Sequence, residues 1–170
     1  MLSERVQNGI YDQINLEFSS SYAYLSMAAF CEWKKFIGCS KWLRMQAQEE
    51  NTHALRLYDY LLARDCQVKL KAIEAPPVNY ESVPAVFAAA LAHEQKVTAS
   101  INDLYKLAYE EGTFATMIEL EWFINEQVEE EKTARQIVAQ FEMVKDDPAA
   151  LLDLDRELGS RKSEEDEAEG

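Results

Sequence analysis

Glu50 and His53 are the residues whose types and spacing most clearly suggest chemistry in this sequence. They stand three apart within residues 46–53 (QAQEENTH), so on a helix they would project from one face about one turn apart. Apolar residues such as Leu43 and Leu57 recur on that same face, which predicts that it points into a core. A carboxylate and an imidazole inside a core need an explanation, and the rest of the chain supplies one.

The elements that would position these residues are long helices. Apolar residues alternate at spacings of three and four along four segments, at about 5–35, 40–64, 82–111 and 114–145. A break is expected at 36–39, with Gly38 as its most permissive residue. Residues 66–82 lack helical periodicity and could span over ~50 Å if fully extended, which would let the second and third helices run parallel. Asp147 and Pro148 are typical of a helix start, so a short fifth helix is expected up to Gly159. The predicted fold is an all-α four-helix bundle with a long crossover between the second and third helices and a short C-terminal fifth helix.

Composition limits the possible functions. The chain has 170 residues, enough for one domain with a real core, and we assign residues 1–162 to that domain and 163–170 to a disordered acidic tail. With 31 acidic against 17 basic residues, the net charge of -14 argues against nucleic acid as a main partner and favours cations. No apolar run approaches the roughly 18 residues of a membrane span, and the N-terminus lacks a signal layout. We therefore expect a cytoplasmic protein whose cysteines, Cys31, Cys39 and Cys66, are reduced thiols.

Each long helix carries a carboxylate midway along its apolar face. These residues are Glu17, Glu50, Glu94 and Glu130. None of the four faces carries Lys or Arg, and burying an unpaired carboxylate costs several kcal/mol. The carboxyl groups could be protonated, or two divalent cations could balance their four charges. Oxygen ligands with one imidazole suit iron, manganese or zinc.

Di-iron carboxylate bundles combine single Glu residues from two helices with Glu-x-x-His from the other two. Here Glu50 and His53 form one such motif, whereas the fourth helix offers Gln127 and Glu130. The site would thus have one ligand fewer, which would leave one cation loosely held, as suits a site that releases its product.

At this point the residues resemble the ferritins, specifically the non-haem bacterial type. The resemblance reaches to about Lys162 and is most specific at 46–53 (QAQEENTH), 125–130 (NEQVEE) and 153–159 (DLDRELG). It implies a ferritin-like fold and a homo-oligomeric cage of 24 subunits, without nucleic-acid or membrane partners. It also implies a ferroxidase, an oxidoreductase that oxidises Fe(II) with O2 or H2O2 at an intrasubunit di-iron centre. The ferric mineral would be stored in the cage cavity, which would serve iron storage, detoxification and iron homeostasis.

Carried over by position, the resemblance implies two iron ions per subunit. One would be held by Glu17, Glu50 and His53. The other would be held by Glu50, Glu94 and Glu130, so that Glu50 bridges the pair.

The resemblance also implies further site residues. Tyr24 matches a tyrosine that supplies an electron during oxygen reduction, although a core tyrosine would fit the same pattern. Gln127 would bind an oxygen species or another ligand beside the centre. A third iron site would use Glu49, Glu126, Glu129 and Glu130. The first three of these residues lie beside the apolar faces, where exposed Glu is also common.

Other functions remain open at this level. Haem-binding bacterioferritins carry Met directly after the motif Glu, and Asn51 stands there, so no haem is expected. A di-metal oxidase or peroxidase for another substrate would want an apolar pocket beside the metals. A DNA-protecting mini-ferritin would place its metals between subunits and lack the fifth helix. A purely structural bundle would keep its carboxyl groups protonated.

Overall fold

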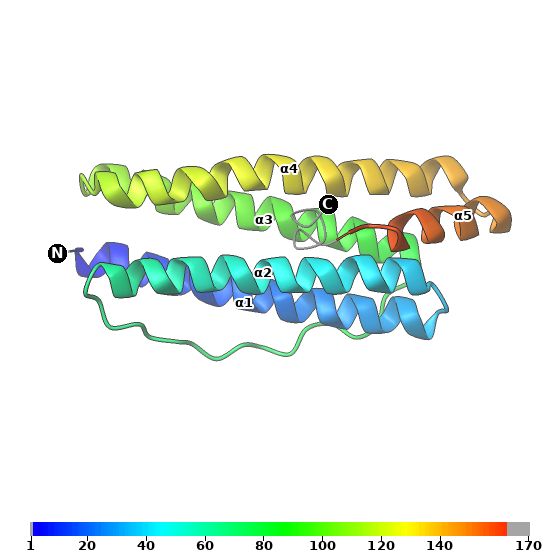
Figure 1. Cartoon of the computed structure of the whole chain (residues 1–170), viewed down its shortest axis with the longest axis horizontal. Coiled ribbons are helices and arrows are strands. Elements are labelled where there is room, and N and C mark those ends of the chain that lie inside the picture. The colour runs from blue at the N-terminus through cyan, green and yellow to red at the C-terminus, as the bar shows by residue number, and fades with distance from the viewer. Residues whose placement is uncertain (1, 163–170) are drawn as a thin grey trace.

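Five helices build the described chain, residues 2–162 of a computed structural model (Figure 1). In chain order they are α1 (Glu4–Trp33), α2 (Ile37–Ala63), α3 (Val83–Glu110), α4 (Phe114–Val144) and α5 (Pro148–Gly159). The predicted all-α bundle with a short fifth helix is therefore confirmed. The predicted acidic tail, residues 163–170, lies outside the described residues. Within residues 2–162, no helix has the length and apolar character that crossing a membrane requires.

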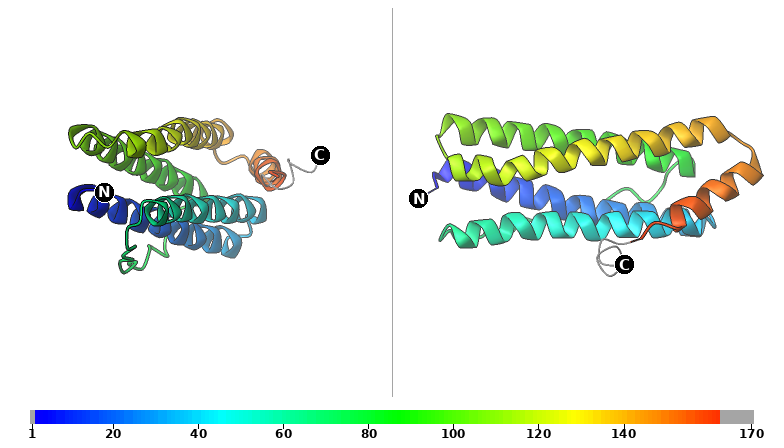
Figure 2. Two further views of the ribbon diagram at one scale, coloured as in Figure 1. Left: turned by 60° about the vertical axis from the view of Figure 1, so that its left-hand side comes forward. Right: turned by 45° about the horizontal axis from the view of Figure 1, so that its top comes forward.

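The long helices form two antiparallel pairs, α1 with α2 and α3 with α4 (Figures 1 and 2). The crossover between α2 and α3 runs the length of the bundle along α1, so α2 and α3 point the same way, as predicted (Figure 1). Several hydrogen bonds fix it to α1, one of them from Lys71 to Asp12. The Tyr11 hydroxyl donates to the Gln67 carbonyl at 2.6 Å, and the Ser26 hydroxyl donates to the Pro77 carbonyl at 2.6 Å.

Helix α5 packs against the start of α2 through Asp155 and Gly38. The Asp155 carboxylate accepts hydrogen bonds from the backbone N–H groups of Gly38, at 3.1 Å, and Cys39, at 2.8 Å, which satisfies two free donors at that helix end. A Cβ on Gly38 would come within 1.7 Å of the Asp155 carbonyl oxygen. The expected role of Gly38 as the permissive residue of a break is thus wrong. The positive φ of that turn, 73°, belongs to Lys35, while Gly38 lies within α2 and allows α5 to approach.

Two apolar clusters fill the bundle and leave a polar layer between them. On α1 one cluster ends at Ile14 and the other begins at Tyr24, and on α2 the same division falls between Ala47 and Leu57. Helices α3 and α4 divide in the same way. The four predicted carboxylates all lie in these intervals, so antiparallel packing brings them to one level of the bundle.

Candidate metal centre

The polar layer gathers the five residues that the sequence singles out as ligands. Glu94 has an exposed fraction of 0%, Glu17 and Glu50 each have 1%, His53 has 5% and Glu130 has 8%. No Lys or Arg belongs to the buried side chains of residues 2–162. The layer therefore holds four acidic groups without a buried basic partner.

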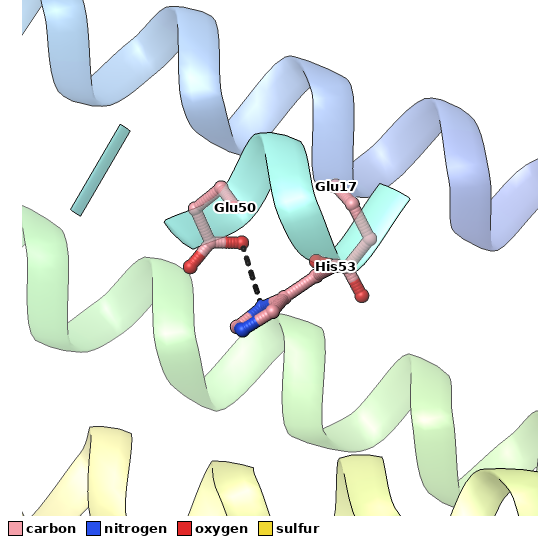
Figure 3. Close-up of side chains that lie close together, drawn as sticks. All are labelled: Glu17, Glu50 and His53. Atoms are coloured by element: carbon pink, nitrogen blue, oxygen red, sulfur yellow. Dashed lines mark ion pairs between the residues drawn. The ribbon is translucent and has the colours of Figure 1, made fainter. Parts of the chain in front are cut away.

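Glu17, Glu50 and His53 form a compact group. One oxygen or nitrogen atom from each lies within 4.8 Å of the others. Figure 3 shows Glu17 reaching from α1 toward the two side chains of α2. His53 Nδ1 is 3.8 Å from Glu50 Oε2, too far for a hydrogen bond but suitable for two ligands of one cation. These are the ligands expected for the first iron ion.

A second compact group, again within 4.8 Å, contains His53, Glu126 and Glu130. Glu130 is an expected ligand of the second ion, whereas Glu126 was expected only in the third site. Glu94 belongs to neither group. Its charge nevertheless acts on both, because it is the charged neighbour that most raises the pKa of Glu50 and that of Glu130.

Three glutamine amides hold three of the four carboxylates. Gln13 Nε2 donates to Glu17 Oε1 at 2.7 Å, and Gln46 Nε2 donates to Glu130 Oε2 at 2.8 Å. Gln127 Nε2 lies 3.1 Å from an oxygen of the third, Glu94 Oε2. Such donors orient ligands.

Glu50 is the exception to this arrangement. Both of its carboxylate oxygens, together with Glu17 Oε2, are buried without a hydrogen-bond partner. Buried polar groups are normally satisfied, and an unsatisfied buried anion is especially costly. Glu17 and Glu50 each place one oxygen within 4.8 Å of the other and of a His53 ring nitrogen, as the ligands of a cation would be, so the donor set fits divalent metal ions.

Burial is the main cause that raises the pKa of the carboxyl groups. The pKa rises to about 7 for Glu17 and to about 8 for Glu130, and it also rises for Glu94 and, most strongly, for Glu50. After burial, the neighbouring charges of Glu94, Glu17 and Glu130 are the main causes that raise the pKa of Glu50. Cations that bind here must therefore displace protons.

The pKa of His53 shifts in the opposite direction, downward. Burial, and then the nearby Arg56 charge, lower its pKa to about 4. The imidazole is thus neutral at physiological pH and has a lone pair for a metal. Its contact with Glu50 is consequently not an ion pair. The Trp122 ring packs edge-on at 5.3 Å between centroids and limits rotation of the imidazole.

An acidic pocket of about 260 Å³ adjoins the centre. Its lining is Gln46, Glu49, Glu126, Glu129, Glu130, Thr133, Arg161 and Lys162. All four residues expected in a third iron site line this one pocket. Two basic residues that follow α5 line it as well.

Comparison with known proteins identifies the family. The family pattern described as Ferritin-like domain matches residues 7–144. The chain belongs to the ferritin family. It is 32% identical over 166 residues to a bacterial non-heme ferritin of Staphylococcus aureus, covering 98% of this chain and 100% of the relative. It is 37% identical to a probable bacterial non-heme ferritin-like protein of Haemophilus influenzae, over 94% of this chain and 97% of the relative.

A solved structure agrees with this ferritin fold. An open pore ferritin from the archaeon Archaeoglobus fulgidus superposes with a TM-score of 0.94 and 41% identity, over 95% of this chain and 100% of that chain. The predicted resemblance to ferritins is therefore confirmed. Ferritins store iron and are generally ferroxidases. A buried set of carboxylate and imidazole ligands that suits divalent cations is therefore expected in this fold.

The two residues expected to be catalytic both contact Glu94 in this ferritin. The buried Tyr24 hydroxyl donates to Glu94 Oε1, and burial is the main cause that raises its pKa, so it stays a neutral phenol. Gln127 binds the other oxygen of Glu94 and lies 3.2 Å from Thr98 Oγ1. In this structure Gln127 therefore orients a carboxylate, a contact that the sequence did not indicate.

Sequence reasoning missed Gln13, Gln46 and Arg161, whose side chains hydrogen-bond to the predicted ligands or to the acids of the pocket. Gln13 precedes Glu17 by four residues, one helical turn on the same face, and this spacing was an available signal. Gln46 lies on the apolar face of α2 but acts across the bundle on Glu130. Arg161 follows α5, and no local pattern indicates where it docks.

Proposed function

We propose that this ferritin is an iron-storage ferroxidase. It would oxidise Fe(II) to Fe(III) with O2 or H2O2 and deposit the ferric mineral in the cavity of a cytoplasmic cage of 24 subunits. The observation that carries the proposal is the set of orphaned oxygens on Glu17 and Glu50 in a buried layer without Lys or Arg. The family of the chain makes iron the natural cation for that layer.

The roles of the ligands follow from their contacts. Glu17, Glu50 and His53 would hold one Fe(II), and Glu50, Glu94 and Glu130 would hold the other. Glu50 suits the bridging position because no donor ties either of its oxygens. Two Fe(II) ions each give up one electron, and O2 or H2O2 accepts the pair. The protein contributes position and charge neutralisation, while the metal supplies the redox chemistry.

The two neighbours of Glu94 would act in different ways. Tyr24, hydrogen-bonded to this ligand, would supply an electron during reduction of the oxidant, and its contact with Glu94 supports that role. Gln127 would keep Glu94 in place and leave the second ion with fewer protein ligands. The pocket residues Glu49, Glu126 and Glu129, together with Glu130, would take a third iron ion. We propose no haem, in agreement with the non-heme names of the relatives.

The other functions considered from the sequence are less well supported. A mini-ferritin would place its metal ligands between subunits, whereas Glu17, Glu50 and His53 meet within one chain that also has the helix α5. A structural bundle with protonated carboxyl groups would not need a neutral imidazole beside two buried carboxyl groups that have unsatisfied oxygens.

Stopped-flow oxidation of Fe(II) tests the proposal, with O2 and with H2O2 as oxidants. Glu50→Ala and His53→Ala should lose the fast phase while keeping the cage, as judged by size-exclusion chromatography. Glu121→Ala, which removes an exposed acid from α4, should match the wild type. Rapid oxidation in either ligand variant would contradict the assignment.

A further inference from the structure

Arg161 inserts a positive charge into the acidic pocket beside the centre. One guanidinium nitrogen, Nη2, lies 2.7 and 2.8 Å from the two oxygens of Glu49. The other, Nη1, donates to Gln46 Oε1 at 2.5 Å. The guanidinium group also lies 5.0 Å from the Trp42 ring centroid. With side-chain exposures of 28% for Arg161 and 21% for Glu49, the pair is largely shielded from solvent.

This position conflicts with metal binding in the same pocket. A hard cation would need carboxylate oxygens from the pocket, and Arg161 occupies both oxygens of Glu49. The guanidinium charge would also repel a cation held by Glu126 or Glu129. A metal ion and Arg161 therefore cannot both use Glu49 in this arrangement.

Gln46 connects Arg161 to the centre. Its amide oxygen accepts from Arg161, while its amide nitrogen donates to Glu130. Arg161 thus fixes the orientation of the amide that fixes Glu130. Because Gln46 is 1% exposed, solvent cannot easily replace either contact.

We propose that Arg161 is a built-in cation of the outer pocket, which a metal ion must displace from Glu49 in order to bind there. The proposal rests on the proposed function, because it takes the pocket as a third metal position beside the di-iron centre. It makes Arg161 the residue that sets how weakly the third ion is held. A weak third position would pass its ion on rather than keep it.

Calorimetric titration with Zn²⁺, which binds without redox chemistry, tests the proposal on the assembled protein. The wild type should show tight binding at the centre followed by a weaker phase in the pocket. In Arg161→Gln the weaker phase should tighten by about tenfold, the effect of one charge-assisted hydrogen-bonded pair. Arg156→Gln removes the same charge from an exposed pair with Asp153 on α5 and should leave both phases unchanged.

Trp42 gives a second readout that a merely structural contact would not change. Displacement of the guanidinium group from this ring should alter tryptophan fluorescence during the weaker phase in the wild type, and no such change should occur in Arg161→Gln. The affinity gain should vanish in Glu126→Gln/Arg161→Gln, which assigns it to the pocket. An unchanged or weakened phase in Arg161→Gln, or an equal gain in Arg156→Gln, would overturn the proposal.

Failure of this inference is distinguishable from failure of the proposed function. If the wild type binds Zn²⁺ tightly and Glu50→Ala does not, the assignment of the metal centre is supported, whatever the effect of Arg161→Gln. If the wild type shows no tight phase that depends on Glu50, the proposed metal centre, and with it the proposed function, is refuted.

Discussion

The affinity of the centre for divalent cations should rise steeply between pH 6 and pH 8. Burial raises the pKa of Glu17 to about 7 and that of Glu130 to about 8, and a cation needs both groups ionised. At pH 6 both groups hold a proton almost completely, whereas at pH 8 Glu17 is mostly ionised and Glu130 is about half ionised. Proton competition from these two groups alone should weaken binding at pH 6, relative to pH 8, by roughly 500-fold.

The other ligands do not reverse this expectation. Glu50 and Glu94 also have raised pKa values, so they change the affinity in the same direction. His53, whose pKa lies at about 4, stays neutral across the interval and adds no proton competition. Glu17 and Glu130 should together release about 1.3 more protons per subunit on binding at pH 6 than at pH 8.

Calorimetry with Zn²⁺ in two buffers of different ionisation enthalpy measures both the affinity and the proton release. Glu130→Gln is the informative variant, because it removes the group with the higher of the two stated pKa values. Its affinity should fall at every pH, while the contrast between pH 6 and pH 8 due to Glu17 should be only about tenfold. Affinities at pH 6 and pH 8 that agree within about threefold in the wild type would refute the reasoning, since the carboxyl groups would then already be ionised.

The same groups link stability to pH. Their pKa values are higher in the folded chain than the ordinary value of 4.5, so the folded chain binds more protons than the unfolded chain above that pH. Their contribution to the free energy of unfolding should therefore fall as pH rises from about 4.5 through 7 for Glu17 and through 8 for Glu130. Added Zn²⁺ should restore the melting temperature most strongly at pH 8.

Two further substitutions test contacts outside the ligand set. Gly38→Ala should cost about 1–3 kcal/mol in the free energy of unfolding, because its Cβ would meet the Asp155 backbone. Gly9→Ala should cost less, since its Cβ would meet only side-chain carbons of Leu104 and Leu107, and equal denaturation midpoints for the two variants would contradict the argument. Gln13→Leu should weaken Zn²⁺ binding at the centre by about tenfold with the cage intact, and calorimetry showing wild-type affinity would exclude a role in orienting Glu17.

The sequence predicted the level of the bundle at which the four buried carboxyl groups lie, and the reason is physical. A helix has a fixed period, so Glu17 and Glu94 could be assigned to inward faces from their spacing alone. Antiparallel pairing and a crossover of sufficient length then brought the helix midpoints together. The same reasoning failed at Gly38, because the feature that requires a glycine there is the backbone of Asp155, over a hundred residues later.

The hydrogen bonds to the ligands were largely beyond sequence reasoning. The bond from Gln13 to Glu17 is local to one helix and could have been found from its spacing. Gln46 and Arg161 act across elements, and their partners depend on side-chain orientations that no periodicity encodes. A motif can therefore name the ligands while leaving out the groups that tune them.

The hydrogen bonds also explain why the four carboxylates are not equivalent. Glu94 has a donor on each oxygen, Tyr24 on one and Gln127 on the other, so its position is the most fixed. Glu50 has a donor on neither among residues 2–162, so its carboxylate could turn to bind the two cations of the proposed centre. Where a symmetric di-iron bundle would carry a second Glu-x-x-His, this chain has Gln127, whose amide nitrogen contacts Glu94. The substitution would thus remove one ligand and hold another, Glu94, in place, which would leave Glu50 as the most mobile carboxylate and the one proposed to bridge the two ions.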